Sequence, residues 1–197
     1  MAQTHDHEIV SIYPFTDEEV DALMNNAVEA VLMWSTKDGW PVGVTHAFVW
    51  HEGKIWLTFA RHRHRARAIE RDNRVSVNVS SASYGPGSGD GLPSGAITFK
   101  GTGEFFEDAE TKHWFYDALA TKVGQGNEDV RKSFYELLDS PLRTVLVVTP
   151  VKKIMYNAAL ANRHIAGTAD ENDLGERLSS DAQRMNKERE KDGLAPR

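Results

Sequence analysis

Hydrophobic residues in the first third of the chain recur at spacings that predict one helix followed by three strands. Thr16-Asp17-Glu18-Glu19 reads as a capping box, and apolar residues follow it every three or four positions as far as Val31. Runs rich in β-branched and aromatic residues, separated by glycine-containing turns, predict strands over residues 30–36, 42–50 and 54–60. This order indicates a helix packed beside a three-stranded meander.

The remaining pattern adds strands and two further helices. Asp108 and Asn127 each precede apolar residues at helical spacing, so we expect them to cap two helices, the second of which ends before Pro141. Strands are predicted over residues 74–81, 96–106, 144–149 and 151–156, with Pro150 separating the last two. Six or seven short strands need a closed or nearly closed sheet to protect their edges. The pattern therefore predicts a mainly β (α+β) fold, an antiparallel barrel with peripheral helices.

Composition indicates a single folded unit with an appended tail. With 197 residues and 40% hydrophobic content, the chain can bury one core. Beyond Gly167 it becomes highly charged and carries few large apolar residues. We therefore expect a barrel domain over residues 1–157 and a charged C-terminal extension over residues 158–197, helical or disordered.

Charge and residue content exclude several classes of function. The formal net charge of −6 argues against a broad nucleic-acid-binding face, because such a face needs many cationic side chains. The absence of cysteine excludes thiolate nucleophiles, disulfides and cysteine-ligated metal sites. No apolar run approaches the roughly 20 residues that cross a bilayer, and the N-terminus lacks a secretory signal. We expect a cytoplasmic protein with neither a membrane nor a nucleic acid as its partner.

The strongest chemical signal is an arginine-rich turn after the third predicted strand. Six arginines fall between residues 61 and 74, and only Glu70 and Asp72 oppose them, which leaves a local excess of four positive charges. Such a cluster is suited to binding a phosphate or another polyanion. Three other interpretations are weaker: a solvated helix face, an RNA-binding surface without interleaved aromatic residues, and a metal site at His62 and His64 that lacks a third ligand.

These segments together carry a resemblance to a known family. Four features of the sequence resemble the FMN-binding split β-barrel family. They are the turn Asp38-Gly39-x-Pro41, the two strands after it, Thr58 followed seven residues later by Arg65, and the helix end over residues 71–77. Pyridoxamine 5′-phosphate oxidase typifies this family, which includes deazaflavin-dependent reductases. The resemblance covers about residues 16–156 and implies a split barrel of six or seven strands.

The resemblance also implies a homodimer whose two cofactors lie in grooves between the subunits. Thr58 would donate its hydroxyl to the cofactor phosphate, Arg65 would replace the usual lysine, and Arg61 or His64 would complete the cradle. The edge strand over residues 42–48 would lie against the ring system. The implied cofactor-binding residues are Thr45, His46, Ala47, Thr58, Arg61, His64, Arg65 and Lys100. FMN is the favoured cofactor, the deazaflavin coenzyme F420 is the alternative, and haem is a weaker one.

The implied activity is that of an oxidoreductase. Hydride would pass between the cofactor and a small organic acceptor or donor, while the protein supplies orientation and electrostatics. His46, Tyr84 and solvent are all open as proton donors, so no catalytic residue is assigned. We find no match to the substrate-phosphate residues of a true pyridoxamine 5′-phosphate oxidase and do not expect that activity. The alternative is a noncatalytic flavin- or haem-binding protein that acts as a carrier, sensor or store.

Overall fold

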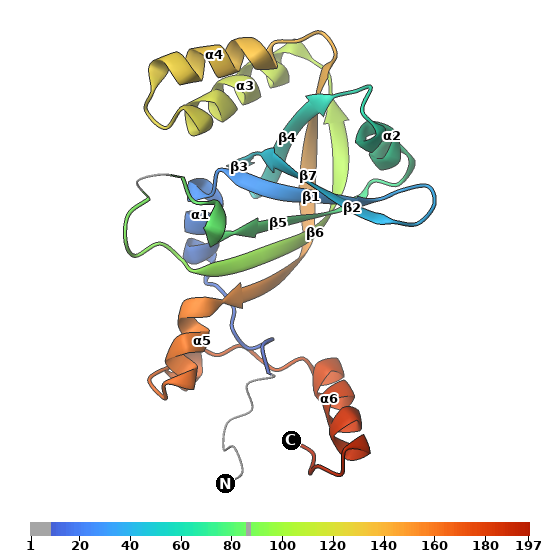
Figure 1. The fold of residues 1–197 in the computed structure, drawn as a ribbon. Coiled ribbons are helices and arrows are strands. Elements are labelled where there is room, and N and C mark those ends of the chain that lie inside the picture. Colours follow the sequence, from blue (N-terminus) through green and yellow to red (C-terminus); the bar gives the residue numbers. More distant parts are fainter. Residues whose placement is uncertain (1–8, 86–87) are drawn as a thin grey trace.

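The computed structural model describes residues 9–85 and 88–197. In these residues, seven antiparallel strands form one curled sheet in the order β2-β1-β5-β6-β7-β4-β3, which makes the predicted split barrel (Figure 1). The strands are β1 (Glu29–Ser35), β2 (Pro41–Ala47), β3 (Val49–His51), β4 (Lys54–Ala60), β5 (Arg74–Ser80), β6 (Gly95–Phe106) and β7 (Arg143–Asn157). The helices are α1 (Asp17–Asn26), α2 (His64–Arg71), α3 (Ala109–Gly124), α4 (Glu128–Leu138), α5 (Ala158–Ile165) and α6 (Ser179–Lys191).

The sequence between β1 and β4 connects the two edges of the sheet. β2 pairs with β1, whereas β3 pairs with β4, so the single strand predicted over residues 42–50 was wrong. Phe48 lies between the two strands with no exposed surface, and the Lys122 ammonium of α3 is 3.8 Å from the centroid of its ring. Alternation of apolar residues is the same on both sides of Phe48, which is why the pattern gave no sign of the change of partner.

The last part of the sheet also differs from the prediction. β7 is one strand of 15 residues, not two strands separated by Pro150. Its pairing with β6 shifts between Lys100 and Gly101, and Gly101 lies opposite Pro150. Proline has no N–H to donate to a neighbouring strand, and an irregularity in the pairing accommodates it without ending the strand.

The core has a main cluster inside the barrel and a second cluster under α3 and α4. The barrel cluster contains fully buried Leu32, Leu57 and Phe99, and the second contains Phe115 and Leu138. The predicted helix caps are confirmed. The Thr16 capping box is present, the Asp108 side chain accepts from the Thr111 N–H at 2.8 Å, and Asn127 accepts from Asp129 and Val130.

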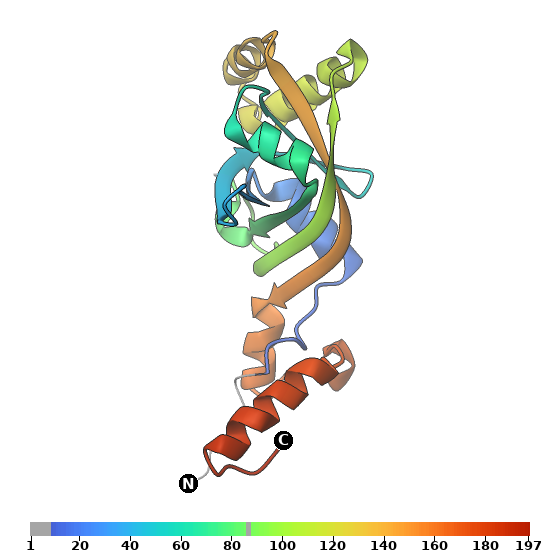
Figure 2. The ribbon, with the colours of Figure 1, turned by 90° about the vertical axis from the view of Figure 1, so that its right-hand side faces the viewer.

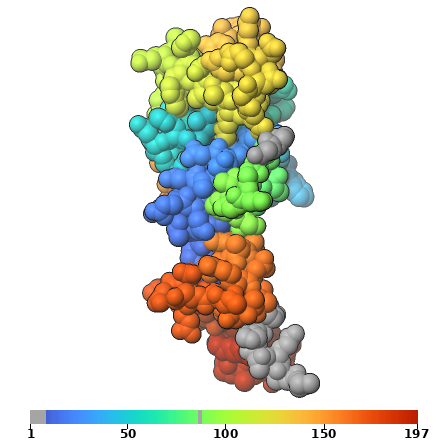
Figure 3. Space-filling model, turned by 90° about the vertical axis from the view of Figure 1, so that its left-hand side faces the viewer, coloured from blue at the N-terminus to red at the C-terminus, as the bar shows by residue number. Residues whose placement is uncertain are grey.

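The C-terminal extension leaves the barrel at the end opposite α3 and α4 (Figures 2 and 3). Leu160 and Ala161 of α5 form a small cluster with Tyr13, whereas none of the residues of α6 is fully buried. The extension is therefore helical over much of its length, and the division into a domain and an extension stays a prediction. In the described part of the chain, no helix has the length and apolar character needed to span a bilayer.

Candidate functional site

The arginine-rich turn leads directly into a helix whose start is suited to an anion. β4 ends at Ala60, and α2 begins at His64 after the N-cap residue Arg63, which makes no side-chain capping bond. The first turn of α2 contains no acidic residue. Because the first N–H groups of a helix lack partners within the helix and carry partial positive charge, an uncapped start flanked by arginines favours an anionic ligand.

Arg65 connects this helix to the edge strand β2. Its guanidinium is hydrogen-bonded to Nε2 of His46, and it lies 5.8 Å from the centroid of the Trp34 ring and 5.3 Å from that of Phe59. An arginine donates this bond, so Nε2 accepts and the imidazole proton lies on Nδ1. Two predicted cofactor residues, 19 positions apart in the sequence, therefore lie together with the side chain of Arg65 fixed by aromatic rings.

The environment of His46 keeps its imidazole neutral. Burial is the largest cause, and the charges of Arg65 and Arg143 add to it, which together lower the pKa of His46 to about 4. A group with this pKa is almost entirely deprotonated at neutral pH, so His46 is a poor general acid there. The contact that the structure shows for its Nε2 is the hydrogen bond from Arg65.

The pKa of His46 predicts a pH dependence of stability. Its pKa of about 4 in the folded protein is below the ordinary histidine pKa of 6.5, so between these two pH values the unfolded state binds more protons. Stability from this group is fully present above pH 6.5 and is lost as the pH falls toward 4. At most about 3 kcal/mol depends on it, since one pKa unit corresponds to about 1.4 kcal/mol. Urea unfolding at a series of pH values measures this loss.

The control for this measurement is a second histidine. The His46→Gln variant is expected to lose less stability than the original protein between pH 6.5 and 4, whereas His62→Gln is expected to retain the original slope because His62 is exposed. Equal slopes for the original protein and both variants would show that His46 titrates normally.

Arg143 is a site residue that the sequence analysis missed. It is half-buried, begins β7 and pairs with Ala60 at the end of β4, beside the arginine-rich turn. The backbone N–H of Arg61 donates to the Leu142 carbonyl at 2.8 Å, which ties the turn to the start of β7. In the sequence, Arg143 is marked only by its position directly after Pro141-Leu142. It reaches the site because β7 pairs with β4, which lies more than 80 residues earlier in the chain.

In the structure, the Thr58 side chain does not lie beside the Arg65–His46 pair. Its hydroxyl is buried and donates to the Thr144 carbonyl at 2.7 Å. Because successive side chains of a strand point to opposite faces, Thr58 lies on the other face of β4 from Phe59, which contacts Arg65. Its assignment to the phosphate stays a prediction that this arrangement does not support.

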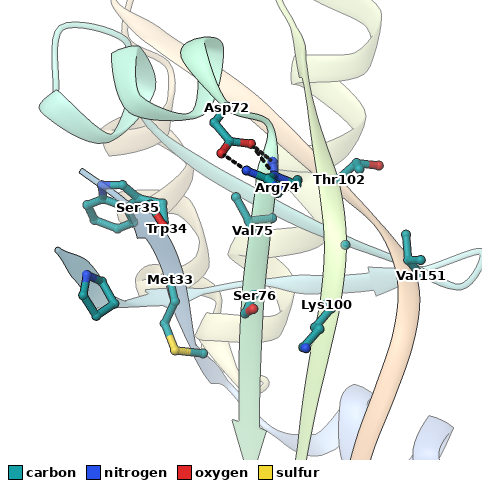
Figure 4. Close-up of a pocket in the computed structure, with 12 residues that line it drawn as sticks. Met33, Trp34, Ser35, Asp72, Arg74, Val75, Ser76, Lys100, Thr102 and Val151 are labelled. Carbon is teal, nitrogen blue, oxygen red and sulfur yellow. Dashed lines mark hydrogen bonds and ion pairs between the residues drawn. The ribbon is translucent and has the colours of Figure 1, made fainter. Parts of the chain in front are cut away.

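The other predicted residues are distributed around the site and beyond it. Thr45, Arg61 and His64 are exposed, the latter two in or directly after the turn, and Ala47 packs against the cluster under α3. Lys100 is exposed on β6 and lines a groove of about 680 Å³ on the outer face of the sheet, with Val75, Ser76 and Val151 (Figure 4). The groove is therefore distinct from the turn, although Trp34 lines it and also contacts Arg65.

The comparisons identify the family. The family model described as pyridoxamine 5′-phosphate oxidase matches residues 16–155. The chain belongs to this family. No curated protein matches the chain.

Solved structures with the same fold have low sequence identity to the chain. A conserved hypothetical protein of Mycobacterium tuberculosis, Rv2991, is 18% identical with a TM-score of 0.60, over 75% of this chain and 87% of that one. An F420 reductase is 19% identical with a TM-score of 0.50, over 68% and 94%. The haem storage protein HutZ of Vibrio cholerae is 13% identical with a TM-score of 0.51, over 71% and 94%. These likenesses establish the split-barrel fold.

The residues at the turn fit a phosphorylated cofactor better than a haem or a metal ion. Guanidinium groups and free helix N–H groups suit a phosphate, and β2 pairs on one side only, so its other edge is free to bind a ring. Nε2 of His46 already accepts from Arg65, which leaves this histidine poorly placed as a haem ligand. Within residues 9–85 and 88–197, no three potential metal ligands form a cluster.

Tyr84, one of the proton donors considered from the sequence, lies far along the sheet from this site. Its hydroxyl donates to the Pro93 carbonyl at 2.6 Å, across the base of a glycine-rich loop over residues 84–93. α2 precedes β5 and Tyr84 follows it, so the length of that strand separates them. Residues 86 and 87 of the loop lie outside the described residues. The described arrangement therefore gives the loop no contact with the arginine-rich turn.

Proposed function

We propose that this protein is an oxidoreductase that binds a phosphorylated flavin or deazaflavin, FMN or coenzyme F420, and transfers hydride to or from a small organic molecule. The observation that carries the proposal is the position of Arg65, held by Trp34, Phe59 and His46 between the start of α2 and the edge strand β2. A phosphate site beside a free strand edge suits a molecule with a phosphate at one end and a planar ring at the other. Membership of the family supports the same class of cofactor.

The chain's own residues would bind and orient the cofactor, which supplies the hydride chemistry when bound. Arg65 and the first N–H groups of α2 would bind the phosphate, and the unpaired edge of β2 would bind the polar edge of the ring. His46 would fix Arg65 in the required orientation before the cofactor arrives. Such preorganisation reduces the cost of ordering the side chain on binding.

A homodimer is part of this proposal. The outer face of the sheet carries the groove with Lys100, and the exposed fractions of Val151, Ile154 and Tyr156 along β7 are 74%, 50% and 42%. Exposed apolar residues that adjoin a groove favour a protein interface. A second copy on this face would cover them and would bring Lys100 toward the partner's cofactor.

Titration of the purified protein with FMN, with coenzyme F420 and with haemin tests the proposed function. We expect micromolar or tighter binding of a flavin or deazaflavin, since three charge-assisted hydrogen bonds contribute about 1.5–3 kcal/mol each before ordering costs. Quenching of tryptophan fluorescence reports binding because Trp34 lies beside Arg65. Binding of neither cofactor would refute the proposal.

A reduction assay then separates an enzyme from a carrier. Turnover of an electron acceptor in the presence of an external reductant is expected of the proposed enzyme. Tight cofactor binding without turnover of any acceptor would favour the noncatalytic alternative.

A further inference from the structure

A cavity separate from the arginine-rich turn lies between α1, the glycine-rich loop and the C-terminal end of α3. Its volume is about 320 Å³, which is at the small end of the range for ligand pockets. The described residues that line it include Asn25 and Asn26 at the end of α1, Ser88 of the loop, and Lys122 and Gln125 at the end of α3. This described lining offers amides, a hydroxyl and one cation, but no carboxylate, and it therefore suits a small polar molecule.

Lys122 extends from α3 to the last turn of α1. Its side-chain nitrogen donates to the Met24 carbonyl at 2.9 Å and lies 3.8 Å from the centroid of the Phe48 ring, which has no exposed surface. In the part of the chain that the structure describes, no carboxylate forms an ion pair with Lys122. The amine is therefore held beside an aromatic ring without an opposite charge to balance it.

These surroundings favour the uncharged form of the amine. Burial lowers the pKa of Lys122 to about 7, from the ordinary lysine value of 10.5. At neutral pH about half of the molecules then have an unprotonated amine, compared with about one in 3,000 for a lysine of ordinary pKa. An unprotonated, desolvated lysine is a nucleophile, and lysines that form Schiff bases are activated in this way.

The contacts of Nζ also determine where its lone pair points. Nζ is bonded to Cε, and the Met24 carbonyl and the face of the Phe48 ring each attract one of its hydrogens. One direction is left for the lone pair of the neutral amine. Lys122 lines the cavity, whereas Met24 and Phe48 do not, so this direction leads away from both residues and toward the cavity.

We propose that Lys122 forms a reversible Schiff base with a small polar aldehyde that binds in this cavity. The Nζ lone pair forms a bond to the carbonyl carbon, and the two amine hydrogens then leave with the carbonyl oxygen as water. The product is an imine, and its formation needs neither an oxidant nor a reductant. The amides of Asn25 and Gln125 and the hydroxyl of Ser88 would bind the hydroxyl groups of the aldehyde. This inference does not depend on the cofactor proposed above.

Trapping the imine in the purified protein tests the inference. Glyceraldehyde is the probe, sodium cyanoborohydride reduces the imine to a stable secondary amine, and peptide mass spectrometry measures the labelling rate at each lysine. Lys132 is the internal control because it is exposed on α4. At neutral pH we expect Lys122 to be labelled at least about 10-fold faster than Lys132, since a larger fraction of its amine is unprotonated. The ratio of the two rates is expected to fall between about pH 7.5 and 9, because only Lys132 continues to deprotonate there.

The dependence on aldehyde concentration distinguishes a binding site from a merely reactive amine. The labelling rate of Lys122 is expected to saturate as the glyceraldehyde concentration rises, whereas the rate of Lys132 rises in proportion. Asn25→Ala removes one amide from the cavity and is expected to raise the concentration for half-saturation about threefold, which corresponds to the loss of one hydrogen bond.

Two variants and the site-resolved rates decide the outcome. Lys122→Arg keeps a cation that can donate to Met24 and is expected to abolish the saturable adduct, whereas Lys132→Arg is expected to retain it. Thermal unfolding checks the fold of each variant, and the rates at Lys122 and Lys132 in the original protein need neither variant. Equal rates at the two lysines at neutral pH, or a rate at Lys122 that does not saturate, would overturn the inference. Neither result would affect the proposed cofactor site at Arg65.

Discussion

Reversing the charge of Arg65 is expected to abolish useful cofactor binding. Arg65→Glu removes the charge-assisted hydrogen bonds to the phosphate and places a carboxylate where the anion binds. The loss of one or two such bonds corresponds to a decrease in affinity of about 100-fold or more. The substitution also ends the contact with His46, so the orientation of the site is lost together with its charge. Fluorescence titration with the cofactor that binds the original protein measures the effect.

Two variants distinguish an effect of the Arg65 side chain from an effect of the net charge of α2. Arg67→Glu makes the same change of charge two positions away, at an exposed side chain, and is expected to weaken binding by less than about threefold because exposed charges are screened. Arg65→Lys keeps the charge and is expected to retain most of the affinity. Binding by Arg65→Glu within about threefold of the original protein would remove Arg65 from the phosphate site.

The elements and the arginine-rich turn were predictable because their signals are local. A capping box, a cap residue before an apolar helical pattern, and an excess of arginines in one short segment are each properties of neighbouring residues. The strand pattern predicted a nearly closed sheet, and the resemblance added the split-barrel type and grouped His46 with Arg65 among the cofactor-binding residues. The structure shows both, through the sheet order and through the Arg65–His46 contact.

The features that were missed depend on contacts between distant segments. Arg143 reaches the site only because β7 pairs with β4, and nothing in its neighbours indicates that pairing. Thr58 matched a position in the family pattern, yet its face of β4 is covered by α3 and its hydroxyl donates to Thr144. A match of residue type and spacing therefore predicted the turn, but it did not predict on which face of β4 the Thr58 side chain lies.

Gly95→Ala is expected to destabilise the barrel at the point where β6 begins. Gly95 has φ +138°, and a Cβ added there would lie 1.9 Å from the Tyr156 carbonyl oxygen of β7. A left-handed φ costs an L-residue roughly 1–2 kcal/mol, and forced overlap in a packed region costs about 1–3 kcal/mol more. We expect a total loss of about 2–5 kcal/mol in the free energy of unfolding, measured by urea denaturation at pH 7.5.

A second glycine separates the two causes of this loss. Gly91 also has a positive φ, +90°, but an added Cβ would meet nothing within 4 Å, so Gly91→Ala is expected to lose only the conformational part, roughly 1–2 kcal/mol. Equal losses of unfolding free energy in the two variants would show that β7 accommodates the added methyl group without a free-energy cost.

Gly95 pairs with Asn157, whose side chain accepts from the Leu160 N–H at the start of α5. The clash in Gly95→Ala is therefore expected to loosen α5 as well, so that trypsin cleaves at Arg163 faster than in Gly91→Ala.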